Sequence, residues 1–584
     1  MSDFSQQSFV KGMNLIIDST RLTDQEYRLG LNLRNRYDTL QPIKEGKKDT
    51  AIPAGLKQEI VTFGDYIIAF IGGFCYYRKF SDTGWQSIVG FKMSSNAPRY
   101  WTCAIPVGLT NYGRLSSASI GDATNTLAGT AEGNLPGLLV QDNISQPQFI
   151  FLDGSGYPAV RTTQNYNEWD VTYGDVTVPP VAVSKTVVTP AVAASIAVMM
   201  DDKREYVPIG NSMTWTDGIL YIASQDGEQI LRSVSGRPLD FVVNVNIIGQ
   251  KGGDAFTTSY SVGVGGISCL RAMSTGGLFV AASNANFLVS KNMTPNAPTV
   301  FGEYTFIRQF LFNATNLSDR TIIDSLGDTR FIDLTGVRSF NAIQQLQNEG
   351  RNSVFTSKIQ PIFGDIVQSA EYAAAILYDN YEFYALNTIL GPVIAVYDTL
   401  TESWSSFDTT QTGGKKVKQL AKIESTIQRL YAIAEDDNLY ELYGGTENAT
   451  SVLRTSSVNH TENGSNGIYR VNTPMYEVKL QDVRIILDNI VADTTLTIEP
   501  FTNNRLSAQD IETKIIKYIP PTVNYNGIAK LDDSNSMLFN AIFPTPNCEQ
   551  GWCVYVLITW TGGQLTQYSM RMVDVTPMNP LNSQ

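Results

Sequence analysis

Short aromatic, strand-like segments recur through most of this chain, and this repetition constrains the fold more than any other feature. The copies lie roughly 50–60 residues apart, a spacing typical of repeated β-sheet units. The clearest copies begin at Tyr66, Ile219, Leu278, Phe331, Tyr381 and Leu430. One small sheet cannot bury both of its faces alone, but sheets arranged around an axis bury them against one another. The sequence therefore predicts an all-β fold containing a β-propeller of about seven blades with insertions.

Turn residues between the segments support this interpretation. Gly72-Gly73 and Asp379-Asn380 each separate two strand-like runs, as expected for tight hairpin turns. Residues 100–136 and 170–200 interrupt the repeat with small and β-branched residues, so we expect insertions there. One helix is predicted, at 342–349.

Composition divides the chain into four parts. Residues 1–50 precede the repeats and carry more basic than acidic residues, and residues 51–445 carry the repeats. The polar, asparagine-rich stretch 446–470 is predicted to be a linker or exposed loop. Residues 471–584 alternate between apolar and polar positions, which predicts a separate C-terminal β-sandwich.

Two interpretations of residues 1–50 are open at this point. The segment either supplies a first strand that closes the propeller or forms an arm that docks on a partner. Thr23 with Glu26 matches a capping box, which predicts a short helical turn over 24–29. In the docking interpretation, the arginines of the segment are the candidate assembly residues: Arg21, Arg28, Arg34 and Arg36.

The chain is acidic, with 43 Lys and Arg against 56 Asp and Glu and a net charge of −13. A protein that clamps nucleic acid needs positive charge to neutralise phosphates, so this class is disfavoured. A pore past which DNA slides is compatible with an acidic wall, because like charges repel. An ordinary acidic protein has the same net charge.

No targeting or membrane-spanning segment is expected. The first residues lack the basic and apolar regions of a signal peptide, and no apolar run approaches the ~20 residues that cross a bilayer. Five cysteines, an odd number, favour synthesis in a reducing cytosol. Cys548 and Cys553 flank a short turn, and whether they form a disulfide is left open.

The sequence offers little that resembles a reactive site. His460 is the single histidine, which excludes multi-histidine metal sites and most histidine-based triads. No GxxxxGK[ST] phosphate-binding loop occurs. Adjacent carboxylates such as Asp201-Asp202 are interpreted as caps of turns. We therefore expect no catalytic residue, no cofactor and no metal site.

Three segments resemble one family of phage proteins. The first contains Gly12-Met13-Asn14, Glu26-Tyr27 and an Asn-x-Arg-x-Arg stretch at 32–36, followed by a proline. The second, 233–241, reads Ser-x-x-Gly-x-Pro-x-x-Phe, and the third, 331–340, reads Phe-x-Asp-x-x-Gly-x-Arg-x-Phe. These segments are similar to the tail nozzle protein, also called hub or muzzle, of short-tailed, podovirus-like bacteriophages, including the crAss-like group.

The resemblance implies a structural virion protein of a phage tail, assembled in the host cytoplasm. It implies a homohexameric ring that contacts the portal adaptor and other tail proteins, with tail fibres or spikes anchored outside. The lumen would retain the packaged DNA and conduct it during ejection, without sequence-specific binding. Neither catalysis nor a cofactor is implied.

Two other functions were weighed against the tail ring. One is a carbohydrate-binding or glycan-cleaving propeller, and the other is a generic interaction scaffold. Exposed aromatic rings would stack on sugars, and the tryptophans considered for this are Trp85, Trp101, Trp169 and Trp404. The competing explanation is that Trp85 and Trp404 pack between blades, because both follow turns at the start of strands.

Overall fold

A computed structural model describes residues 2–17, 19–36, 38–105, 137–152, 156–162, 207–233, 256–259, 266–273, 277–282, 285–290, 307–312, 316–325, 327–341, 355–424, 428–458, 461–464, 467–470, 476–503, 507–518 and 537–577. The predicted all-β class is confirmed, since strands dominate these residues and short 3-10 turns interrupt them. The predicted helix at 342–349, the insertion at 170–200, Trp169 and His460 lie outside the described residues.

Seven small sheets follow one another between residues 57 and 442. Their strands are β8 (Lys57–Phe63), β9 (Tyr66–Ile71), β10 (Phe74–Lys79) and β11 (Gln86–Ser87); β12 (Trp101–Ile105), β13 (Gly137–Gln141), β14 (Gln148–Leu152) and β15 (Pro158–Thr162); β16 (Gly210–Thr216), β17 (Ile219–Ser224), β18 (Gln229–Arg232) and β19 (Phe256–Ser259); β20 (Ile267–Ala272), β21 (Leu278–Ala282), β22 (Ala285–Ser290) and β23 (Ile307–Phe312); β24 (Ile322–Ser325), β25 (Asp328–Asp333) and β26 (Gly336–Ser339); β27 (Ala374–Tyr378), β28 (Tyr381–Thr388), β29 (Gly391–Asp398) and β30 (Ser403–Asp408); and β31 (Val417–Glu424), β32 (Gln428–Ala434) and β33 (Leu439–Leu442). Within each sheet, strands adjacent in sequence pair antiparallel.

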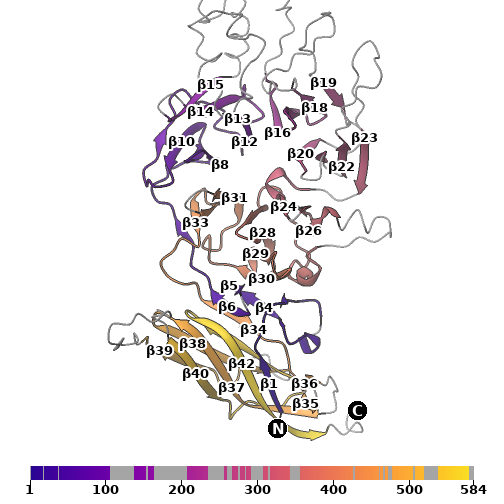
Figure 1. The fold of residues 1–584 in the computed structure, drawn as a ribbon, viewed down its shortest axis with the longest axis vertical. Coiled ribbons are helices and arrows are strands. Elements are labelled where there is room, and N and C mark those ends of the chain that lie inside the picture. Colours follow the sequence, from indigo (N-terminus) through magenta and orange to yellow (C-terminus); the bar gives the residue numbers. More distant parts are fainter. Residues whose placement is uncertain are drawn as a thin grey trace, which may run out of the picture.

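The first strands of these sheets contact one another in a closed order. β8 contacts β12, β12 contacts β16, and β16 contacts β20. The 3-10 turn η4 (Asp319–Thr321) links β20 to β27, β27 contacts both β24 and β31, and β31 returns to β8. Figure 1 shows the sheets grouped around a common centre. We call this assembly of seven sheets the sheet circle.

Burial on both faces explains the sequence of the central strands. An apolar cluster lies between each neighbouring pair of sheets around the circle. The second strand Tyr66–Ile71 is therefore buried along its whole length, and its sequence is continuously apolar rather than alternating. Each fully buried aromatic or aliphatic side chain contributes about 1.5–3 kcal/mol to this packing. The hairpin turns predicted at Gly72-Gly73 and Asp379-Asn380 are confirmed, since all four residues have positive φ.

Two further sheets face each other at the other end of the molecule and share one core, and we call them the sheet pair (Figure 1). One sheet has the order β40-β37-β42-β6-β5, with β1 also paired to β42. The other continues from β30 through β4, β34, β41 and β38 to β39. Their strands are β1 (Ser2–Gln6), β4 (Leu29–Leu31), β5 (Leu33–Arg36), β6 (Thr39–Pro42), β34 (Ser451–Arg454), β37 (Tyr476–Ile490), β38 (Thr494–Thr502), β39 (Glu512–Ile516), β40 (Met537–Pro544), β41 (Val554–Trp560) and β42 (Gln564–Pro577).

Residues 1–50 divide between the two regions instead of forming a separate arm. β7 (Lys47–Lys48) pairs with β33 and so completes the last sheet of the circle, as the closing-strand interpretation expects. Strands β1, β5 and β6 instead join the sheet pair. The helical turn predicted over 24–29 is wrong. Thr23 and Glu26 do hydrogen-bond to each other, but Glu26 begins strand β3 (Glu26–Tyr27) and no helix follows Thr23.

The segment 446–470 is not the linker predicted from its polar composition. It contains β34 and the hairpin β35 (Thr461–Gly464) with β36 (Gly467–Arg470). Ser451 is buried, and its hydroxyl donates to the carbonyl of Asn32 at 2.7 Å. Buried hydroxyls that bond to backbone allow a polar sequence to occupy the inside of a sheet.

Two smaller expectations can be compared with the structure. All five cysteines are buried and none is in a disulfide, so Cys548 and Cys553 are not linked to each other. No helix among the described residues is long and apolar enough to cross a bilayer.

Candidate functional site

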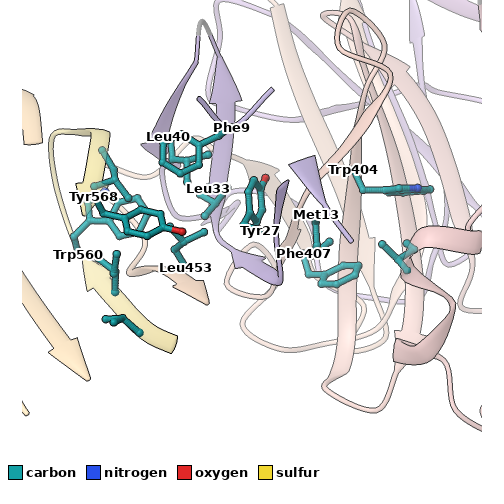
Figure 2. Close-up of a cluster of buried hydrophobic side chains, with 14 of the residues drawn as sticks. Phe9, Met13, Tyr27, Leu33, Leu40, Trp404, Phe407, Leu453, Trp560 and Tyr568 are labelled. Atoms are coloured by element: carbon teal, nitrogen blue, oxygen red, sulfur yellow. The ribbon is translucent and has the colours of Figure 1, made fainter. Parts of the chain in front are cut away.

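The N-terminal residues that carry the family resemblance lie where the sheet circle meets the sheet pair, a region we call the joint. β4 connects the two regions directly, because it pairs with β30 on one side and β34 on the other. One apolar core runs through the joint from the circle into the sheet pair (Figure 2). Its labelled members are Phe9, Met13, Tyr27, Leu33, Leu40, Trp404, Phe407, Leu453, Trp560 and Tyr568.

Gly12 allows the N-terminal chain to lie directly against β30. Its φ is +67°, a conformation that residues with a side chain rarely adopt. A Cβ atom at this position would overlap the carbonyl oxygen of Trp404. Glycine is therefore required at this contact by both backbone conformation and space.

Asn14 and Glu26 form a buried polar pair next to this contact. The Asn14 side-chain amide donates to Glu26 at 3.1 Å, and its oxygen accepts from the backbone N–H groups of Ile16 and Ile17. Burial opposes ionisation of Glu26, but hydrogen bonds from Asn14 and Thr23 and the nearby Lys358 charge together hold its pKa below the ordinary value. The pair fixes the path of the chain between β2 (Gly12–Met13) and β3.

Asn32 ties the end of β30 to the start of β34. Its φ is +54°, in the left-handed region that asparagine tolerates better than most residues. Its side-chain N–H donates to the hydroxyl of Thr409 at 3.2 Å and to the carbonyl of Thr450 at 3.1 Å. Its side-chain oxygen accepts from the Thr409 backbone at 2.8 Å. One side chain thus connects two strands that are remote in sequence.

Arg34 makes the strongest charged contact of the joint. Its guanidinium donates to both oxygens of Asp408, at 3.0 and 2.6 Å. Ser406 and Tyr443 donate to the same carboxylate at 2.7 and 2.6 Å, so each oxygen accepts two hydrogen bonds. The Tyr443 ring lies 4.9 Å from the guanidinium carbon. Burial disfavours the charge, but Asp408 outweighs it and raises the pKa of Arg34 above its ordinary value.

Arg36 makes a related but more exposed contact on the same sheet. It donates to the Tyr381 hydroxyl at 2.7 Å and forms an ion pair with Asp379 at 2.9 Å. The hydrogen bond to Tyr381 is the main reason that the pKa of Arg36 is raised. About a third of the Arg36 side chain and half of that of Asp379 are exposed, so solvent screens the pair.

The other two predicted assembly arginines do not reach this sheet. Arg28 donates to the carbonyl of Ile17 at 2.6 Å and supports the N-terminal loop. Arg21 is exposed in the 3-10 turn η1 (Ser19–Arg21). The structure therefore brings Arg34 and Arg36 together on β27–β30 of their own chain. Contact of any of the four with another subunit stays a prediction.

Sequence reasoning missed Asp408 and Tyr443, the partners of Arg34. Asp408 ends a strand, where a carboxylate usually caps a turn, and no local signal distinguishes the two roles. Tyr443 has φ +60°, which no sequence pattern indicated. Both residues are more than 370 positions from Arg34, so only the folded chain shows the contact.

Two of the tryptophans considered for sugar stacking, Trp404 and Trp85, have packing contacts instead, and Trp101 lies in the wall of a cavity described below. Trp404 is 2% exposed and packs against Tyr384 and Tyr397, at ring distances of 5.8 and 5.3 Å. Trp85 packs under Arg78, whose guanidinium carbon lies 4.8 Å from the ring. These contacts agree with packing rather than with a sugar platform.

Comparisons with known proteins give no family. No protein-family profile matches the sequence, and no curated protein matches it. The extracellular domain of the putative one component system BT4673 from B. thetaiotaomicron is 10% identical, covers 95% of this chain and 63% of its own, and gives a TM-score of 0.37. This chain thus spans less than two thirds of that domain.

Two other solved structures are similar at a still lower level. Virginiamycin B lyase from Staphylococcus aureus is 12% identical, with 47% of this chain and 86% of the lyase covered and a TM-score of 0.23. The N-terminal domain of Nup159 is 9% identical, with 66% and 74% covered and a TM-score of 0.23. These likenesses are too weak to indicate a function.

Proposed function

We propose that this chain is a structural subunit of a bacteriophage tail, the nozzle or hub ring of a short-tailed phage. In this proposal the sheet circle is a seven-bladed β-propeller and the sheet pair is a β-sandwich. The ring retains packaged DNA, conducts it during ejection and anchors tail fibres. The chain has no catalytic role.

The observation that carries the proposal is the place of the first resembling segment, which lies at the joint. In this segment Gly12 lies against Trp404 of β30, Asn32 bonds next to β30 and β34, and Arg34 bonds to Asp408 of β30. The third resembling segment, 331–340, lies in the fifth sheet of the circle, and the second lies almost wholly outside the described residues. A conduit that holds DNA under load needs its two parts to move together, and a buried, hydrogen-bonded joint provides this rigidity.

The acidic composition supports passage of DNA rather than its capture. With a net charge of −13, the chain repels phosphates on average and favours sliding over binding. Long-range repulsion of this kind weakens with salt, because the Debye length is about 10 Å at 0.1 M ionic strength.

A ring also needs a contact surface between subunits, and the open edge of the sheet pair is our candidate. Within the described residues, β39 and β40 each pair with a strand on one side only. They lie at the same edge, where Lys514 of β39 donates to the carbonyl of Ile542 on β40. Outward-facing Ile515 and Leu538 are 68% and 63% exposed. Unpaired strand edges with apolar side chains favour association with another chain.

Negative-stain electron microscopy and mass photometry of the purified chain, alone and with its portal adaptor, test the proposal. We expect rings with a mass near six times 64.3 kDa. The double variant Ile515→Lys, Leu538→Lys should stay folded but lose the ring. Leu400→Lys, which changes an equally exposed residue (75%) on the sheet circle, should keep it. A chain that stays monomeric at micromolar concentration with the adaptor present would refute the proposal.

A further inference from the structure

A charged cavity of about 340 Å³ lies among the inner strands of the sheet circle, and we call it the axial cavity. Six of the seven sheets contribute to its wall, through β8, the start of β12, β20, β24, β27 and β31. Its size is near the lower end of the ~300–1,000 Å³ typical of small-ligand sites. It is separate from the joint and from the β39–β40 edge.

The axial cavity is positively charged in an acidic protein. Its cations are Arg99, Arg271, Arg320 and Lys422, and its carboxylates are Glu59, Asp319 and Asp324. Four positive and three negative charges leave a local net charge of +1, against −13 for the chain. The excess favours an anion over a metal cation in this space.

The arginines of the axial cavity differ in how they are paired. Arg320 is buried and contacts Glu59, and Arg99 pairs with Asp319 at 2.6 Å. Arg271 is 3.8 Å from Asp324 and its side chain is 45% exposed. This loose pair leaves the Arg271 guanidinium available to a ligand.

Three buried N–H groups in the wall have no hydrogen-bond acceptor among the described residues. They are the Nε atoms of Arg99 and Arg320 and the indole Nε1 of Trp101. The guanidinium carbon of Arg99 lies 4.6 Å from the Trp101 ring, so two of these donors are close together. An unsatisfied buried donor costs about 1–3 kcal/mol. Because less than 1 Å² of each of these atoms is exposed, a bound acceptor reaches them only after a shift of the side chains, and the removed cost favours that shift.

The pKa shifts of Arg320 and Glu59 also favour an anion in the axial cavity. Burial lowers the pKa of Arg320 despite Glu59, and the nearby Arg99 lowers it further. Burial also raises the pKa of Glu59 despite Arg320. The Arg320 guanidinium therefore lacks full compensation, and an additional negative charge nearby stabilises it.

We propose that the axial cavity binds a small oxyanion, a phosphate or carboxylate group, with Arg271 as its principal charged contact and with Arg99 and Arg320 as neighbouring positive charges. The guanidinium fork matches the oxygen spacing of both groups. The terminal nitrogens of Arg320 donate to Lys418, Gln58 and Glu59, so Arg320 acts through its charge. Trp101 also lines the cavity, and its indole N–H has no acceptor among the described residues. This proposal does not depend on ring assembly or on a role in a phage tail.

Calorimetric titration and thermal unfolding of the full chain test the site. The probes are inorganic phosphate and succinate, each compared with potassium chloride at equal ionic strength to remove general screening. We expect one site per chain and a saturable rise in Tm with either or both anions. A response to one anion alone identifies which oxyanion chemistry the cavity selects.

Arg271→Gln is the principal variant. Because Arg271 is partly exposed and only loosely paired with Asp324, we expect the variant to fold normally. It should weaken anion binding about tenfold, the value of one charge-assisted hydrogen bond. Trp101→Phe keeps the ring but removes the N–H, and we expect a smaller loss. The matched control is Lys517→Gln, which removes an exposed ion pair with Asp493 on the sheet pair and should not change binding. No saturable binding above chloride, or equal affinity in Arg271→Gln and Lys517→Gln, would overturn the proposal.

Discussion

The joint and the axial cavity both bury arginine–carboxylate pairs, but they satisfy them differently. At the joint, both oxygens of Asp408 accept two hydrogen bonds each, and Arg34 is stacked beside Tyr443. In the axial cavity, Arg99 and Arg320 each keep a buried N–H without an acceptor among the described residues. A saturated ion pair indicates a structural role, whereas a loosely paired arginine in the wall of a cavity leaves capacity for a ligand. The following predictions test this distinction.

The largest effect is expected at the centre of the joint. Asp408→Ala leaves Arg34 as a buried charge without its partner, and we expect a loss of about 3–5 kcal/mol in the free energy of unfolding. Urea denaturation of the purified chain measures it. The double variant Arg34→Met, Asp408→Leu should lose much less, because both charges are removed together. Equal losses in the two variants would mean that packing, not charge pairing, stabilises the joint.

Gly12→Ala should give the next largest effect. The substitution places a Cβ against the carbonyl of Trp404 and forces alanine to a φ of +67°, so we expect a loss of about 3 kcal/mol. Gly391→Ala is the control, because Gly391 has a φ of +93° but open space around it. It should lose about 1 kcal/mol from the backbone alone. If the two variants are equally stable in thermal unfolding, the close approach of Gly12 to β30 does not contribute to the stability of the fold.

The dependence of stability on pH should have opposite signs in the two regions. The ordinary glutamate pKa is 4.5; it is lowered for Glu26 at the joint and raised for Glu59 in the axial cavity. The stabilisation from Glu26 is present above 4.5 and is lost as pH falls through its lowered folded-state pKa. The contribution of Glu59 is fully present below 4.5 and is lost as pH rises through its raised folded-state pKa.

Urea denaturation of Glu26→Gln and Glu59→Gln from about pH 3 to about pH 7 measures these slopes. As pH falls, the advantage of the wild type over Glu26→Gln should shrink, and its stability relative to Glu59→Gln should grow. Parallel slopes for the two variants would show that the two carboxylates sit in equivalent environments, which contradicts the comparison.

The sequence predicted those parts of the fold that local patterns determine. The strand Tyr66–Ile71 was found because a strand covered on both faces is continuously apolar, and its turn because Gly72-Gly73 favours positive φ. The division into four parts did not anticipate that β1 pairs with β42, since that contact joins the two ends of the chain. Pairing over such distances leaves no periodic signal in either segment.

The joint shows the same limit at the level of single residues. Arg34 was selected as an assembly residue from its place in a basic segment, but its partner Asp408 lies in the sixth sheet of the circle. The hydroxyls of Ser451 and its neighbours made 446–470 look exposed, although Ser451 is buried in a sheet. Polar residues indicate exposure only where their hydrogen bonds are made to water.

The smallest effect is expected at the rim of the joint. Arg36→Gln removes an ion pair with Asp379 that is partly exposed on both sides, and such pairs contribute about 0.2–1 kcal/mol. The variant should unfold within ~1 kcal/mol of the wild type, and added salt should reduce the difference. A loss as large as that of Asp408→Ala would place Arg36 in the buried network instead of beside it. The contrast between two arginines on one strand, Arg34 and Arg36, would then no longer follow from their burial.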